Sequence, residues 1–211
     1  MQKIYGQGDN NHHESETGNI IIAAFYLEKG LQALTEDNFE NAIDLLTSYL
    51  EYDPEDALVY DRRGIAYGKM YRYDEALADF NRAIECEGEF AGAYNNRGLT
   101  CYKLEQYDKA ISDYNRAIEL DPGVAVFYAN RGLAHMHNGD IDAAITDYNK
   151  AIALDPELPE THNNRGEAYT RIGLYQQAIE DFDRELTIDP NSLESYANRT
   201  IAMQLLRYGY S

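Results

Sequence analysis

Hydrophobic and polar positions along the chain return in the same order every 34 residues. Each period holds two stretches in which apolar or small residues stand four and then three positions apart. That spacing places them on one face of a helix, so every period predicts a pair of helices. In most copies an Asp-Pro pair follows the second stretch, where it ends one helix and begins the next. A period of this length in a helix-forming sequence is typical of repeat arrays.

A recurrent glycine sets the register of the repeats. It stands at residues 64, 98, 132 and 166, and we number each repeat from 1 to 34 with this glycine at position 8. A single array is expected over 20–211, after a flexible leader over 1–19 that is polar and lacks an apolar core. The expected repeats are 23–56, 57–90, 91–124, 125–158 and 159–192, followed by a terminal helix over 193–208.

Small residues predict how the two helices of a repeat pack. The first helix carries its core face at positions 4, 8 and 11, and the second at positions 20, 24 and 27. Glycine inside a helix costs about 1 kcal/mol relative to alanine, so its return at position 8 predicts a close approach of two helices. Aromatic rings such as those of Tyr60 and Phe80 are expected to fill the space beside it.

Arginine at position 7 recurs together with aspartate at position 23. We expect these residues to form ion pairs that tie two helices together. Repeat one has Lys29 and Leu45 instead, and no pair is expected there. The four expected pairs are Arg63–Asp79, Arg97–Asp113, Arg131–Asp147 and Arg165–Asp181.

These residues resemble the tetratricopeptide repeat family over residues 23–211. The shared pattern is an aromatic residue at positions 4 and 24, Gly at 8, Tyr at 11, Ala at 20 and 27, and Pro at 32. Repeat one departs from it at Ala33, Leu46 and Tyr49, and repeat five at Glu185. The resemblance implies an all-α, right-handed superhelical solenoid of antiparallel helix pairs whose first helices line a concave groove. It also implies that the chain binds a protein or peptide partner without chemistry of its own.

Charge and composition narrow the class of partner. The net charge is −19, which disfavours nucleic acid and anionic membrane surfaces because both attract clustered Lys and Arg. No apolar run reaches the ~20 residues of a membrane helix. Cys86 and Cys101 form no CxxC pair, which favours a reducing, cytoplasmic setting. Enzyme motifs are absent and His12-His13 has no further ligands, so we expect no catalysis, no cofactor and no metal.

Asparagine returns at position 6 of the first helices, on the face expected to line the groove. An amide offers donors and an acceptor at each rung, which suits the main chain of an extended peptide. The pattern resembles the asparagine ladder in the repeats of the O-linked N-acetylglucosamine transferase. The alternative is that these amides are solvated copies without a ligand. The candidate peptide contacts are Asn96, Asn130, Asn164 and Asn198, with Asn95 and Asn163 beside them.

Position 13 of the same helices is basic, with Lys69, Lys103, His137 and Arg171. In so acidic a chain this row predicts a preference for an acidic peptide, contacted by Lys69, Lys103 and Arg171. The alternative is that these cations only stabilise helix ends, where they contribute about 0.3–1 kcal/mol without a ligand. Positions 5 and 9 lack the Lys and Asn with which chaperone-binding members of the family clamp a terminal carboxylate. Binding of a heat-shock chaperone is therefore not assigned.

The C-terminal helix carries apolar residues that include Ile201, Met203 and Leu206. A terminal repeat normally has a polar outer face. Either Tyr208 and Tyr210 fold back over this helix, or the surface meets another molecule. The second alternative makes the chain a self-assembling scaffold, a homo-oligomer that associates through its C-terminal helix.

Overall fold

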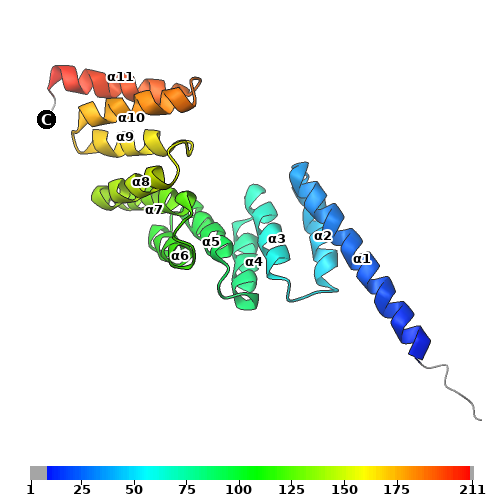
Figure 1. Ribbon diagram of the computed structural model, residues 1–211. Coiled ribbons are helices and arrows are strands. Elements are labelled where there is room, and N and C mark those ends of the chain that lie inside the picture. The colour runs from blue at the N-terminus through cyan, green and yellow to red at the C-terminus, as the bar shows by residue number, and fades with distance from the viewer. Residues whose placement is uncertain (1–8, 210–211) are drawn as a thin grey trace, which may run out of the picture. The chain divides into compact units, whose positions relative to one another are not determined.

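Helices make up the regular structure of the described chain. The computed structural model describes residues 9–209, with side chains from Thr17 onward (Figure 1). No strand occurs in this range, so the predicted all-α class is confirmed. The helices are α1 (Asp9–Thr35), α2 (Phe39–Leu50), α3 (Ala57–Lys69), α4 (Tyr73–Cys86), α5 (Ala91–Lys103), α6 (Tyr107–Leu120), α7 (Ala125–Asn138), α8 (Ile141–Leu154), α9 (Thr161–Arg171), α10 (Tyr175–Ile188) and α11 (Leu193–Tyr208).

The N-terminal helix reaches into the stretch that the sequence predicts to be a flexible leader. α1 begins at Asp9, so the segment 9–19 is helical. Once a packed segment has nucleated a helix, each further residue adds a hydrogen bond at little cost, and polar residues can extend it. Residues 1–8 and the side chains of His12 and His13 lie outside the described part of the chain, so the structure does not bear on the absence of a metal there.

The helices form two compact units, and the boundary between them falls inside α5, after Asn96. In the first unit α1 packs on α2 and α3 on α4, while α2 also packs on α3. In the second unit α7 packs on α8 and α9 on α10, while α8 contacts α9, α6 contacts α7 and α11 covers α10. Consecutive helices therefore form hairpins that bury their apolar faces on their neighbours, as in a solenoid of repeats.

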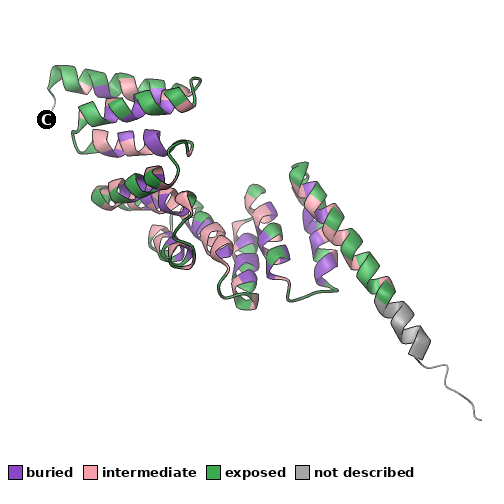
Figure 2. Ribbon diagram, in the orientation of Figure 1, coloured by how far each residue is buried: buried purple, intermediate pink, exposed green. Residues whose placement is uncertain are grey.

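Small and aromatic residues form the core of each hairpin as predicted, and Figure 2 shows the buried residues on the facing sides of the helices. A Cβ added to Gly64 would lie 2.8 Å from the ring of Phe80, and one added to Gly166 would lie 2.7 Å from the ring of Phe182. The ring occupies the space of the missing Cβ, which explains the glycine at position 8. The second helices of the middle repeats bury Ala76, Phe80, Ala83, Ala110, Tyr114, Ala117, Ala144, Tyr148 and Ala151.

The predicted ion pairs are confirmed in all four repeats. Nε and Nη2 of Arg131 donate to the two carboxylate oxygens of Asp147 at 2.8 and 2.6 Å. Nη1 of the same guanidinium donates to Asn115 of α6 at 2.6 Å. Arg165 repeats this contact with Asn149 of α8, also at 2.6 Å. Each of these arginines thus ties its own hairpin to the second helix of the preceding repeat, a link that the sequence did not reveal.

Candidate peptide-binding face

The candidate residues lie on one side of the odd-numbered helices, which we call the ladder face. It is the side that carries repeat positions 5, 6 and 13. Positions 6 and 13 stand seven residues apart, about two helical turns, and therefore share a face. In the first unit the ladder face comprises Asp61, Lys69, Asn95 and Asn96. In the second unit it comprises Lys103, Asn130, Asn163, Asn164, Arg171 and Asn198.

In the first unit the ladder connects one repeat to the next. Nδ2 of Asn96 donates to Oδ1 of Asp61 at 2.7 Å, and Oδ1 of Asn96 accepts from Asn95 at 3.3 Å. Asp61 is 2% exposed. Burial raises its pKa, and the hydrogen bond from Asn96 and the charge of Arg62 offset this only in part. Asp61 was not predicted as a functional residue, although it occupies position 5, next to the ladder.

In the second unit one of the predicted contact residues, Asn163, is buried. Asn163 is 4% exposed between α9 and α11. Its Oδ1 accepts from Ser195 at 3.1 Å and from Asn198 at 3.2 Å, and its Nδ2 donates to Glu194 at 3.3 Å. Its amide therefore holds α11 to α9, and a peptide contact by Asn163 stays a prediction.

Asn164 differs from the other residues of the ladder. It is half-buried and, among the ladder asparagines that the structure describes, only its side chain makes no hydrogen bond. The reason lies one repeat earlier, at position 5. Asp61 and Asn163 accept a hydrogen bond from the asparagine of the following repeat, but the equivalent residue for Asn164 is Ala129, which has no polar side chain. Asn164 therefore retains all the donors and acceptors of its amide.

Two of the three predicted basic contacts carry unpaired charge. Lys69 and Lys103 are exposed in the last turns of α3 and α5, and neither forms an ion pair with a described carboxylate. Their place in a last turn also agrees with the alternative of a stabilised helix end. Arg171 differs, because it lies 3.0 Å from Glu167 and donates to the carbonyl oxygen of Met136 at 3.5 Å. Its charge is therefore partly balanced by an exposed carboxylate.

A cluster of rings beside the ladder face was not predicted. His137, at position 13 of α7, lies between Tyr102 and Tyr107, with ring centroids 5.5 and 5.8 Å away. Nζ of Lys103 lies 5.8 Å from the centroid of the Tyr102 ring. Burial raises the pKa of the Tyr102 hydroxyl. The rings give this part of the second unit an aromatic surface next to an unpaired lysine.

The two histidines at core positions have different environments. His162 is buried, with its ring nitrogens 3.3 Å from Asp181 and 3.3 Å from the carbonyl oxygen of Pro156. It replaces the tyrosine that stands at position 4 in the three preceding repeats, and both of its ring nitrogens lie within 3.3 Å of a partner in the fold. His135 is half-buried, with Nε2 3.9 Å from Asp147.

The C-terminal helix exposes its apolar residues. Ile201, Met203 and Leu206 are each about half exposed, and Tyr208 is 63% exposed. Tyr208 therefore does not fold back over α11. Tyr210 lies outside the described residues.

From Thr17 to Gly209 no three His, Cys, Asp or Glu side chains gather as they would around a metal ion. Within the same part of the chain, no helix is both long and apolar enough to cross a bilayer.

Comparison with family models identifies the repeats. Models described as tetratricopeptide repeat match residues 57–87, 91–124 and 159–192, and a model described as TPR repeat matches residues 136–173. Together they cover more than half of the chain. The chain belongs to the tetratricopeptide repeat family.

Solved structures agree with this family. The crystal structure of MamA protein is 25% identical, with a TM-score of 0.69 over 80% of this chain and 92% of that chain. YrrB, described as a tetratricopeptide protein with an unusual peptide-binding site, is 23% identical, has a TM-score of 0.67 and shares the fold over 83% of this chain and 90% of its own. The first tetratricopeptide domain of Spaghetti (RPAP3), bound to the HSP90 peptide SRMEEVD, is 27% identical, with a TM-score of 0.55 over 56% of this chain and 93% of that chain.

Each curated relative matches this chain over one short stretch. A FAM10 family protein of Arabidopsis thaliana is 37% identical over 57 residues, and the SGT1 homolog of Oryza sativa subsp. japonica is 42% identical over 57 residues. The stretch is 27% of this chain but only 13% and 16% of those relatives. The similarity therefore carries nothing about the rest of the relatives.

Proposed function

We propose that this chain is a non-enzymatic, cytoplasmic adaptor that binds an extended acidic segment of a partner protein on its ladder face, without a cofactor and without nucleic acid. Its family supports the coarser part, since tetratricopeptide repeats serve as protein-interaction modules. The Spaghetti domain binds a peptide with three acidic residues among its seven, SRMEEVD. For the present chain, the acidic preference is argued from its own lysines.

Unpaired positive charge on the ladder face carries the proposal. The chain has 37 acidic residues against 18 basic ones, so a lysine without a carboxylate partner stands out. Lys69 in the first unit and Lys103 in the second are both exposed and unpaired. An acidic segment would find its counter-charge there, whereas the rest of the surface would repel it. Arg171 adds a weaker attraction because Glu167 already accompanies it.

Asn164 is the proposed main-chain contact. Its amide is uncommitted and can bind the N–H and C=O groups of an extended peptide at once. Asn96, Asn130 and Asn198 are secondary contacts in this proposal, and Asn95 lies beside them. Asn96 and Asn198 already donate to Asp61 and Asn163, which leaves them fewer free groups.

Selection from a phage-displayed library of random dodecapeptides tests the proposal. We expect acidic peptides to be enriched on the wild-type chain. Fluorescence anisotropy with a labelled synthetic copy should show about threefold to tenfold weaker binding to Lys103→Gln and to Asn164→Ala. Lys109→Gln removes the same charge from α6, away from the ladder face, and should leave the affinity nearly unchanged. Asn198→Ala removes an amide that already donates a hydrogen bond to Asn163, and it should weaken binding less than Asn164→Ala.

Two results would refute the proposal. The first is a selection in which acidic peptides are not enriched. The second is equal weakening by Lys103→Gln and Lys109→Gln, because that would show an effect of net charge without a site.

Self-assembly through α11 is a second candidate, favoured by the apolar residues that this helix exposes. Tyr196 and Met203 stand on the side that faces a second helix in the full repeats, and about half of each is exposed. Multi-angle light scattering over a dilution series tests this candidate. A mass that falls with dilution, and that Met203→Glu reduces to the monomer, would support it; a monomer at every concentration would remove it.

A further inference from the structure

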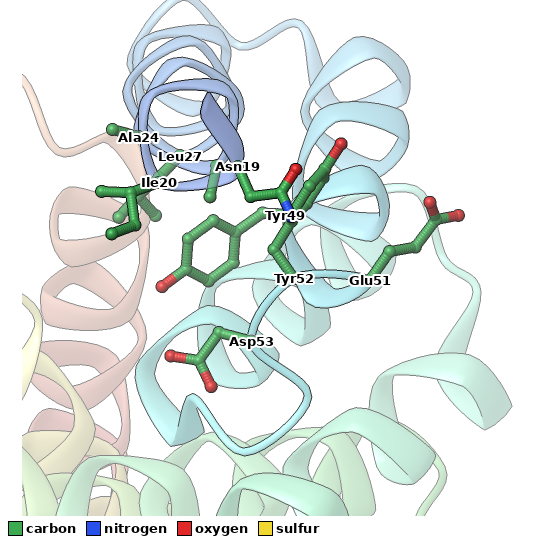
Figure 3. Close-up of a pocket in the computed structure, with 9 residues that line it drawn as sticks. Asn19, Ile20, Ala24, Leu27, Tyr49, Glu51, Tyr52 and Asp53 are labelled. Carbon is green, nitrogen blue, oxygen red and sulfur yellow. The ribbon is translucent and has the colours of Figure 1, made fainter. Parts of the chain in front are cut away.

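A hollow at the start of the first unit is separate from the ladder face. It lies between α1 and the end of α2, has a volume of about 580 Å³ and is lined in part by Ile20, Leu27, Tyr49 and Tyr52. Figure 3 shows Ile20 and Leu27 of α1 to one side of Tyr52. α1 has 27 residues and α2 only 12, so the N-terminal part of α1 extends past its partner helix and forms one wall. We call this site the α1 hollow.

The wall that α1 contributes is apolar around the helix. Ile20, Ile21 and Ile22 follow one another, and because successive residues point about 100° apart, no single neighbour covers all three. They are 69%, 65% and 43% exposed, and Phe25 is 53% exposed. A helix that is apolar on all sides is normally enclosed, and a contiguous exposed apolar surface marks a site of interaction. Of these residues only Ile20 lines the α1 hollow, whereas Ile21, Ile22 and Phe25 lie outside it. Ile20 therefore gives the hollow an open apolar wall.

Acidic side chains give the α1 hollow its charge. Glu51 and Asp53 line it, and both are exposed. Neither forms an ion pair with a described Lys, Arg or His. Oδ1 of Asp53 accepts a hydrogen bond from the N–H of Glu55 at 3.3 Å, which orients the carboxylate and leaves its charge unbalanced. A basic group placed beside these two carboxylates would balance both.

We infer that the α1 hollow docks a partner segment that inserts an aromatic or branched aliphatic side chain and places a Lys or Arg beside Glu51 and Asp53. A second copy of this chain is a poorer occupant, because it would bring its own carboxylates against Glu51 and Asp53 in a molecule of net charge −19. The inference does not rest on the proposed function of the ladder face. The two surfaces differ in the sign of the charge that they select.

The same dodecapeptide selection tests this inference through a different class of peptides. We expect a second enriched class that combines an apolar residue with Lys or Arg. For a labelled peptide of this class, Ile20→Glu should weaken binding about tenfold or more, because it places a carboxylate in the apolar wall. Ile21→Glu is the matched control, since Ile21 is equally exposed on the same helix but does not line the hollow. It should change the affinity less than about twofold.

A second pair of variants tests the charge. Glu51→Gln with Asp53→Asn keeps the shapes and the turn, and should weaken the basic class about fivefold. Glu119→Gln with Asp121→Asn changes the same repeat positions in repeat three, where Asp121 likewise accepts a backbone hydrogen bond, and should have no effect. Lys103→Gln should weaken only the acidic class, so that either site can fail without the other.

Three results of the peptide experiments would overturn the inference. They are the absence of a basic, apolar class from the selection, equal weakening by Ile20→Glu and Ile21→Glu, and equal weakening by the two carboxylate pairs. A wild-type dimer in light scattering that Ile20→Glu converts to a monomer would also overturn it, because a second copy would then fill the hollow. Circular dichroism of each variant confirms that the chain is still folded, as expected for substitutions at exposed positions.

Discussion

Repeats one and five both lack the alanine of position 27. The residue that replaces it forms hydrogen bonds at the end of the repeat in one case and at its start in the other. In the three middle repeats this residue is Ala83, Ala117 or Ala151, each with no exposed surface. Repeat one has Tyr49 and repeat five has Glu185, which are 9% and 3% exposed. A polar group in such a place costs free energy unless it is hydrogen-bonded, so each must have a partner that the middle repeats lack.

In repeat five that partner is the start of the repeat's own first helix. α9 begins at Thr161, two positions later in the repeat than α3, α5 and α7, and Pro159 stands at their starting position. Glu160 precedes the helix with a left-handed φ of 63° and gives it no side-chain cap. Glu185 takes over this role from α10, accepting from the N–H groups of Glu160 at 2.9 Å and of Asn163 at 3.3 Å. The carboxylate also suits the positive end of the helix dipole.

In repeat one the partner is the start of the following repeat. The hydroxyl of Tyr49 donates to Oδ2 of Asp56 at 2.9 Å, and Oδ1 of Asp56 caps α3 by accepting from the N–H of Val59 at 3.1 Å. Burial and the hydrogen bond to Asp56 raise the pKa of Tyr49 to about 12. In both repeats the residue that departs from the pattern at this packed position supplies a hydrogen-bond partner at the start of a helix. Tyr49 serves the first helix of the following repeat, whereas Glu185 serves the first helix of its own repeat.

Replacing the basic residue at position 7 should give the largest difference in stability between repeat five and repeat one. Arg165→Met leaves Asp181 buried without its main partner, and we expect the free energy of unfolding to fall by about 3–5 kcal/mol. Lys29 lies beside the exposed Glu28, and Lys29→Met should change it by less than about 0.5 kcal/mol. Urea unfolding followed by circular dichroism measures both. Equal midpoints would show that the pair in repeat five is as weak as a surface contact.

The same pair predicts how the two variants respond to acid. Burial alone would raise the pKa of Asp181, but hydrogen bonds from Arg165 and His162 hold it below its usual value. Because the unfolded chain takes up this proton at a higher pH than the folded chain, stability is present at neutral pH and falls as the solution is acidified. Arg165→Met should lose part of this acid dependence, and Lys29→Met should retain it. Unfolding midpoints measured from neutral pH into the acid range provide the test.

Restoring alanine at position 27 of repeat five should have the next largest effect. Glu185→Ala removes the acceptor for two N–H groups at the start of α9, and we expect a loss of about 2–3 kcal/mol in stability. Glu185→Gln retains an acceptor oxygen and should cost about 1 kcal/mol. Hydrogen exchange should show the N–H groups of Glu160 and Asn163 less protected in the alanine variant. Unchanged stability of Glu185→Ala would break the comparison, since Glu185 would then be a passive replacement.

Removal of the hydroxyl in repeat one should have the smallest effect at neutral pH. Tyr49→Phe loses one hydrogen bond, worth about 1 kcal/mol. Because the unfolded tyrosine ionises near pH 10 and the folded one near pH 12, wild-type stability should fall as the pH rises through this window. The difference between the wild type and Tyr49→Phe should shrink there. Tyr71→Phe is the control, because its ring is 79% exposed, and a shrinkage of equal size in that variant would contradict the assignment to Tyr49.

Repetition is what made the fold predictable. Helix faces follow from spacings of three and four residues, which depend on helix geometry alone. The packing of rings on glycine and the Arg–Asp pairs followed because each copy tests the same hypothesis again, as Arg63 with Asp79 and Arg97 with Asp113 do. The helical segment 9–19 was missed because polar residues give little periodic signal of their own.

The sequence predicted which residue types form the candidate site, but not which of them already have hydrogen-bond partners in the fold. Six asparagines share one pattern, yet they differ in their hydrogen bonds. Asn163 bonds to side chains of α11, whereas Asn164 has no such bond because the residue that would accept it is Ala129. Nothing in the repeat distinguishes them without knowledge of which side chain meets which across two helices. The α1 hollow was missed for the same reason, since it depends on how far α1 extends past α2.

The sequence by itself thus determined the repeat, the helix pairs, the core positions and the family to which the chain belongs. These follow from the order and spacing of residues along one helix. Which polar groups are already bonded, and where an apolar surface is exposed, became clear only from the packing of the helices. The physical reason is that an amide or carboxylate has few hydrogen-bonding sites, and whether they are occupied is set by distances between helices that are far apart in the chain.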